Sequence, residues 1–71
     1  MPIDAMTIQI NGEAKEVSDG TTLTQLLGEL QIRPGRVVVE LNREIVPRDS
    51  FGATLLQAGD SLEIVQFVGG G

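Results

Sequence analysis

Alternating apolar and polar positions predict the first β-strand, and a two-residue turn after it predicts a hairpin. Apolar and polar residues alternate along Met6–Ile10, which is the period of a strand with one buried face. Asn11-Gly12 follows, a dipeptide typical of tight hairpin turns. Glu13–Val17 is then the returning strand. Because this strand contains few apolar residues, we expect it at an edge of the sheet.

One amphipathic helix is predicted after the hairpin. Thr22 is a suitable N-cap, and Gln25 three residues later completes a capping-box pattern. Four leucines then follow the spacing i, i+3, i+4, i+7, which forms one apolar stripe: Leu23, Leu26, Leu27 and Leu30. Pro34 and Gly35 end the helix. Since no second helix is predicted, we expect the leucine stripe to pack against the sheet.

Two strands follow the helix directly. Val37–Leu41 is strongly apolar, with alternate residues on one face. Asn42–Glu44 is predicted as a turn that leads into a short strand at Ile45–Val46. Pro47 closes that strand and cannot donate a hydrogen bond to a ladder, which favours a place at the sheet edge.

The last third of the chain contains one more strand. Arg48–Phe51 is a short irregular stretch with the length of a single helical turn, and Leu55-Leu56 is expected to supply core residues. Ser61–Val68 is the final strand, directly before three glycines. The first and last strands are the most apolar, so we expect them to be central neighbours.

This order of elements predicts an α+β fold with a β-grasp (ubiquitin-like) arrangement. A mixed sheet of four to five strands would carry one helix on one face. Residues 1–68 would form a single domain with a loose lead-in at 1–5, and residues 69–71 a flexible glycine tail.

The last strand is expected to have two apolar faces. If Leu62 and Ile64 face the helix, Val65 and Phe67 lie on the open face of the sheet beside the tail. An exposed apolar patch of this kind is typical of an interaction site, so Val65 and Phe67 are candidate docking residues.

Composition excludes most kinds of reactive site. The 71 residues include no cysteine and no histidine, which removes thiolate chemistry, disulfides and the commonest metal ligands. A net charge of −5 disfavours nucleic-acid binding. No apolar run approaches the roughly 20 residues of a membrane-spanning helix, and no signal peptide is recognisable. We expect a cytoplasmic protein that is not itself an enzyme.

The glycine tail offers the remaining candidate group. Gly69, Gly70 and Gly71 have no side chain, so their backbone can enter a narrow site and present the carboxylate of Gly71. A carboxylate must be activated before group transfer, and adenylation by ATP is the simplest route. Because the sequence has no G-x-x-x-x-G-K-[ST] motif, we expect a partner to bind the ATP and this chain to bind no cofactor.

The chain resembles the ubiquitin-like sulfur carriers, and among them the ThiS family of thiamine thiazole synthesis. The Asn42–Arg48 segment and the compact length are the more particular features, whereas a Gly-Asp turn with a terminal diglycine is shared more widely. The matching stretches cover nearly the whole chain after Met6: Asp19–Leu23 with Leu26-Leu27, Glu40–Arg48, Gly59–Val65 and Phe67–Gly71.

The resemblance implies a carrier that is acted on by other proteins. A ThiF-type adenylyltransferase would adenylate Gly71, a sulfur donor such as a cysteine desulfurase would give a thiocarboxylate, and a ThiG-type thiazole synthase would receive the sulfur. Gly70 and Gly71 match the family diglycine, and Gly69 adds slack. Val65 and Phe67 correspond only by position, as docking residues. The free carrier is expected to be a monomer without membrane or nucleic-acid partners.

Three other functions fit the same sequence features. The small subunit of molybdopterin synthase has the same fold, tail and thiocarboxylate. A protein modifier would be joined through Gly71 to a lysine amine. A β-grasp interaction domain would have glycines that are merely frayed and could be deleted without loss.

Overall fold

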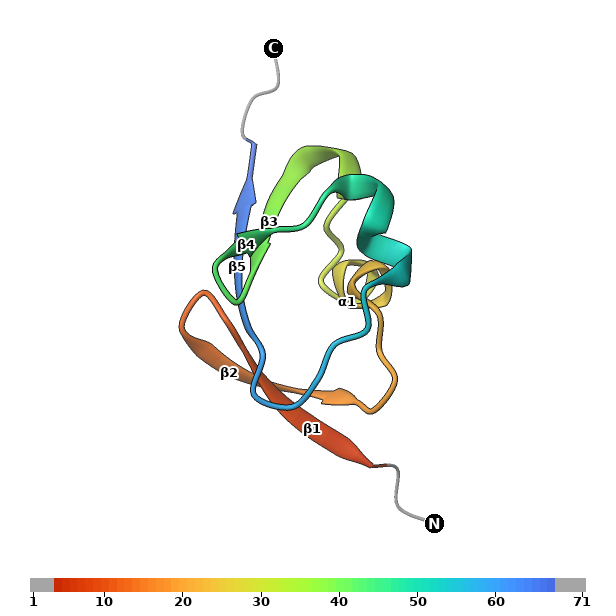
Figure 1. The fold of residues 1–71 in the computed structure, drawn as a ribbon, viewed down its shortest axis with the longest axis vertical. Helices are drawn as coiled ribbons and strands as arrows, with labels where there is room; N and C mark the ends of the chain where they lie inside the picture. Colours follow the sequence, from red (N-terminus) through yellow and green to blue (C-terminus); the bar gives the residue numbers. More distant parts are fainter. Residues whose placement is uncertain (1–3, 68–71) are drawn as a thin grey trace.

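A five-stranded mixed sheet carries one α-helix on one of its faces (Figure 1). The computed structural model describes residues 4–67, and the strand order is β2-β1-β5-β3-β4. An antiparallel hairpin, β1 (Ala5–Ile10) and β2 (Glu13–Ser18), forms one side. The other side is β3 (Val37–Leu41) with β4 (Glu44–Ile45). Between them, β5 (Ser61–Gln66) runs parallel to β1 and antiparallel to β3.

This topology is the predicted β-grasp arrangement. The first and last strands are neighbours, and β2 and β4 lie at the two edges, as their composition indicated. Strand β1 begins at Ala5, one residue earlier than Met6, so Ala5 does not belong to a loose lead-in. Residues 1–3 of that lead-in lie outside the described residues.

The helix has the predicted start. In α1 (Leu23–Glu29), the Thr22 Oγ1 accepts from the Gln25 backbone N–H at 3.2 Å, and the Gln25 Oε1 accepts from the Thr22 N–H at 2.9 Å. This reciprocal capping box satisfies two backbone donors that a helix start would otherwise leave free. Two 3₁₀ segments complete the chain, η1 (Pro34–Arg36) and η2 (Arg48–Ala53).

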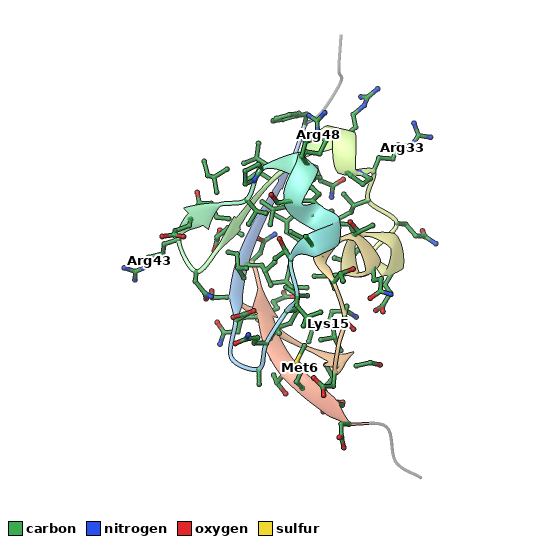
Figure 2. All side chains as sticks on the ribbon, turned by 45° about the vertical axis from the view of Figure 1, so that its right-hand side comes forward. Met6, Lys15, Arg33, Arg43 and Arg48 are labelled. Carbon is green, nitrogen blue, oxygen red and sulfur yellow. The ribbon has the colours of Figure 1, made fainter. Side chains whose placement is uncertain are left out.

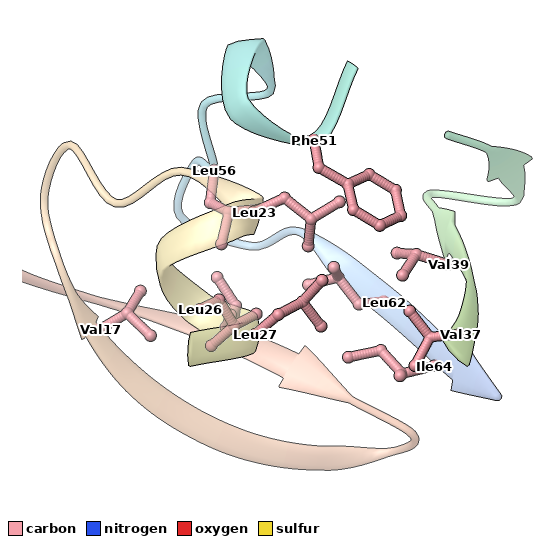
Figure 3. Packing of buried hydrophobic residues seen from close by; sticks show 11 residues of the cluster. Val17, Leu23, Leu26, Leu27, Val37, Val39, Phe51, Leu56, Leu62 and Ile64 are labelled. Atoms are coloured by element: carbon pink, nitrogen blue, oxygen red, sulfur yellow. The ribbon is translucent and has the colours of Figure 1, made fainter. Parts of the chain in front are cut away.

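One hydrophobic core lies between α1 and the sheet (Figure 3). The helix contributes the buried leucines of the predicted stripe, and Leu30 packs against them from the helix C-cap. Phe51, on η2, closes one side of the core with only 3% of its surface exposed. The buried set is Ile8, Val17, Leu23, Leu26, Leu27, Val37, Val39, Phe51, Leu56, Leu62 and Ile64.

The prediction that Leu55 and Leu56 both belong to the core was half wrong. Leu56 is buried, but Leu55 is 57% exposed. The two residues lie in an extended segment, where successive side chains point in opposite directions. The Leu55 backbone bridges Thr22, and the Leu56 N–H donates to the Thr21 carbonyl at 2.9 Å. These contacts fix which of the two side chains points inward.

The Asn11 side chain extends the pairing between β1 and β5. The parallel ladder holds only two residue pairs. Beyond it, the Asn11 Oδ1 accepts from the Ile64 N–H at 2.8 Å, and the Asn11 Nδ2 donates to the Ile64 carbonyl at 3.2 Å. The Asn11 N–H also donates to the Leu62 carbonyl at 2.8 Å. The amide therefore acts as a further ladder residue, from a backbone with a positive φ of 51°.

The turn between β3 and β4 differs from its prediction by one residue. Asn42 and Arg43 both have positive φ, of 52° and 75°, which makes a two-residue hairpin turn, so β4 starts at Glu44 and not at Ile45. The Asn42 Oδ1 accepts from the Ser61 N–H at 3.0 Å, and its Nδ2 donates to the Asp60 Oδ1 at 3.0 Å. These two hydrogen bonds to Asp60 and Ser61 stabilise a hairpin turn that the Asn-Arg dipeptide does not itself predict.

Replacing Asn11 by glycine is expected to lower the free energy of unfolding by roughly 1–2 kcal/mol, because two hydrogen bonds to Ile64 are lost. Glycine accepts the positive φ, so backbone strain adds nothing to the effect. Chemical denaturation measures the change. Arg43→Gly is the matched control at another positive-φ turn residue, and we expect it to be neutral or stabilising. Equal losses in both variants would contradict a specific role for the Asn11 amide.

Candidate functional site

The described chain ends where the predicted reactive segment begins. Gly69, Gly70 and Gly71 lie outside the described residues, as does Val68, the expected end of the last strand. Strand β5 itself ends at Gln66. The Phe67 N–H still donates to the Arg36 carbonyl at 2.9 Å and so continues the pairing of β5 with β3 by one residue. The position of Phe67 is therefore fixed by the centre of the sheet.

Both predicted docking residues are exposed on the open face of the sheet. Val65 is 57% and Phe67 is 52% exposed, whereas Leu62 and Ile64 point into the core. The alternation of side chains along β5 explains this division. The sequence prediction of which residues face the helix is confirmed, while their role in docking stays a prediction.

Two further residues join Val65 and Phe67 on this face. Val38 of β3 lies directly opposite Val65, and Ile45 of β4 lies opposite Glu40, which in turn pairs with Glu63 of β5. Ile45 is 66% exposed. We call Val38, Ile45, Val65 and Phe67 the open-face patch. Glu40 and Glu63 lie in the same cross-strand row as Ile45 and border the patch there.

Sequence reasoning missed Val38 and Ile45 as members of this patch. The alternation of Val37, Val39 and Leu41 on one face leaves Val38 on the other, but the sequence analysis did not connect Val38 with Val65 and Phe67. Ile45 was assigned to a strand without a face. The pairing of β3 with both β4 and β5 is what brings Val38 and Ile45 onto the same face as Val65.

Within residues 4–67 the side chains form no group suited to catalysis by a metal. No cluster of three or more Asp or Glu residues there could hold a metal ion. Every buried side-chain nitrogen or oxygen in this part of the chain has a hydrogen-bond partner. None of the helices in this range is long and apolar enough to span a bilayer. The distinctive feature of the described surface is the open-face patch, which includes Phe67 at the end of the described chain.

Comparison with known proteins connects this geometry to one family. A family model described as the ThiS family matches residues 8–71, which includes the whole glycine tail. The chain belongs to the ThiS family. This membership confirms the resemblance found in the sequence, and with it the β-grasp fold.

Individual relatives agree with the family assignment. The chain is 32% identical to the sulfur carrier protein ThiS of Escherichia coli over 66 residues, which are 93% of this chain and 100% of that protein. It is 38% identical to ThiS of Bacillus subtilis over 65 residues, which are 90% of this chain and 98% of that one. It is also 46% identical to a thiazole synthase of Magnetococcus marinus over 66 residues, which are 93% of this chain. The chain spans only 20% of that synthase.

A solved structure has the same fold. The crystal structure of the thiamine biosynthesis protein ThiS from Geobacter metallireducens superposes with a TM-score of 0.79 at 36% sequence identity. The match covers 93% of this chain and 100% of that one. The ThiS fold therefore extends over the sheet and the helix described above.

Threonine substitutions at adjacent positions of β5 should separate the two faces of the strand. Ile64→Thr places a hydroxyl in the core and is expected to lower the free energy of unfolding by roughly 2 kcal/mol or more. Val65→Thr keeps the branched shape on an exposed face, so we expect a change within about 0.5 kcal/mol. Thermal or denaturant unfolding measures both. A large loss at Val65 would mean that this residue serves stability and not docking.

Proposed function

We propose that this ThiS-family chain is a sulfur carrier whose Gly71 carboxylate becomes a thiocarboxylate and supplies the sulfur of the thiazole ring of thiamine. The observation that carries the proposal is the family match, because it runs through residue 71 and so includes the glycine tail. The chain acts as a co-substrate of partner enzymes and is not itself an enzyme. The cytoplasm is its proposed location.

The chemistry needs two successive transfers to the Gly71 carboxyl group. A carboxylate oxygen of Gly71 attacks the α-phosphorus of ATP, which forms an acyl adenylate and releases pyrophosphate. A sulfide-level donor then attacks the acyl carbon, the bond to AMP breaks, and the thiocarboxylate remains. The absence of cysteine and histidine supports this route, since the sulfur has no side chain of this protein to occupy. ATP is held by the adenylating partner, of the ThiF type. A cysteine desulfurase is the proposed sulfur source: its persulfide displaces AMP to give an acyl disulfide, and a second thiol then reduces the S–S bond and releases the thiocarboxylate, whereas free sulfide gives the thiocarboxylate directly.

The proposed acceptor of the sulfur is a thiazole synthase of the ThiG type. Proteins named thiazole synthase in two bacteria contain a segment 46% and 47% identical to this chain, which spans a fifth of their length. A segment similar to this chain is thus part of polypeptides that are named thiazole synthase. This arrangement supports a functional partnership between the two.

The open-face patch is the proposed docking surface for these partners. Binding of a partner would remove the apolar surface of its exposed members from water: Ile45, Val65 and Phe67. Phe67 lies at the base of the glycine tail, so a partner that covers the patch has the tail directly beside it. The glycines Gly69 and Gly70 would then pass through a channel too narrow for a Cβ atom.

The thiocarboxylate can be detected by intact mass. After incubation with the adenylating enzyme, ATP and sulfide, the protein that ends at Gly71 should gain the mass difference between one sulfur and one oxygen atom. Deleting Gly70 and Gly71 should abolish the gain without changing the unfolding transition. An unchanged mass under conditions that produce the acyl adenylate would contradict the proposal. Recovery of the molybdopterin synthase large subunit instead of thiazole synthase in a pull-down would show that the chain supplies sulfur for molybdopterin and not for thiamine.

Docking through the open-face patch can be tested with two equally exposed residues. Val65 and Leu55 are both 57% exposed, but Leu55 lies beside the helix N-cap and not on the sheet. Val65→Asp should raise the Kd for the adenylating enzyme by about tenfold or more, because it buries a charge at the interface. Leu55→Asp should leave that Kd within about twofold. Equal effects of the two substitutions would exclude the patch as the docking surface.

A further inference from the structure

Positive charge gathers at the end of an acidic molecule where β5 ends. The chain has ten acidic and five basic residues. Arg33 and Arg48 lie at that end, whereas Lys15 and Met6 lie toward the other (Figure 2). Arg36 is held there as well, because its carbonyl accepts from the Phe67 N–H at 2.9 Å. Three of the five basic residues therefore lie toward the end of the molecule where β5 ends.

Two of these arginines are placed side by side by a short rigid segment. The Arg36 N–H donates to the Arg33 carbonyl at 3.0 Å and closes one 3₁₀ turn, in which residues three apart lie on the same side. Pro34 restricts the backbone of this turn. Both arginines line one shallow depression, together with Gln31, Gln66 and Phe67. We call Arg33 and Arg36 the arginine pair.

No carboxylate of the described chain is hydrogen-bonded to the pair. The side-chain hydrogen bonds found within residues 4–67 are made by asparagine, aspartate, threonine and glutamine and use no guanidinium. Two like charges on one side of a turn repel each other, which gives no stability to the free chain. Their guanidinium groups are suited to bidentate binding of a carboxylate or phosphate from outside.

The distance along the chain favours a carboxylate over the phosphates of ATP. Gly71 is four residues beyond Phe67, which gives a maximum reach of about 14 Å. In the proposed adenylation, the nucleotide phosphates meet the carboxylate at the far end of an extended tail. The arginine pair, at the base of the tail, would then lie against the protein wall around the channel entrance.

We infer that the arginine pair, Arg33 with Arg36, binds acidic side chains on the adenylating partner beside the entrance of the channel that receives the glycine tail. This inference rests on the proposed function. It assigns the two contacts different roles: the open-face patch supplies apolar contact, and the arginine pair orients the chain so that the tail points into the channel. Charge pairs at the rim of an interface act mainly on association rate and register.

The test is the double charge reversal Arg33→Glu/Arg36→Glu. At about 0.05 M ionic strength it should raise the Kd for the adenylating enzyme on the order of tenfold, mostly through slower association, and the effect should shrink at about 0.5 M. The matched control, with the same change in net charge, is the double charge reversal Lys15→Glu/Arg43→Glu at positions away from Arg33 (Figure 2). We expect the control to stay within about twofold of the unchanged chain.

The possible failures are distinguishable. If the unchanged chain is adenylated and the double variant binds with the same Kd as the control, the inference is wrong and the proposed function stands. A salt-independent loss would also contradict it. If the unchanged chain binds the enzyme but is never adenylated, the proposed function fails, and the inference with it. Titration of ATP into the isolated chain is the second measurement: chemical-shift changes at Arg33 and Arg36 would overturn the assignment to a protein carboxylate.

Discussion

The pairing of β1 with β5 connects the two halves of this small protein, and the position of Phe67 at the end of β5 depends on it. The ladder is short, and the Asn11 side chain lengthens it by binding both backbone groups of Ile64. On its other side β5 pairs with β3 over five residue pairs. A strand held on both sides has a fixed alternation of faces. Phe67 therefore leaves the sheet at a defined position and on the open face.

Because of this alternation, one face of β5 stabilises the fold and the other face is exposed for the proposed recognition. Leu62 and Ile64 pack under the helix, and without them a domain of this size would lose much of a marginal core. Val65 and Phe67 remain in water, where they gain nothing for the isolated chain. One strand thus anchors the fold with one face, and it presents apolar surface beside the tail with the other. The proposed partner site uses the second face without disturbing the first.

The proposed carrier chemistry would require few reactive side chains on the described surface. A carrier that is modified at its terminus needs a scaffold, a docking surface and a tail, and its side chains need only position them. The arginine pair fits this plan, since η1 holds it next to Phe67. In an acidic molecule, the arginine pair would orient the chain on the adenylating partner as well as contribute to affinity.

The sequence by itself determined the elements that local physics controls. The leucine spacing and the Thr22–Gln25 capping box predicted the helix, and the alternation in β1 and β5 predicted their buried faces, because these signals depend only on near neighbours. The tertiary structure decided the rest. It turned Leu55 outward through the bridge to Thr22, and it brought Val38 opposite Val65 and Ile45 opposite Glu40. It also brought Arg36 beside Phe67. Each of these outcomes requires contacts between residues far apart in the chain, which no local pattern specifies.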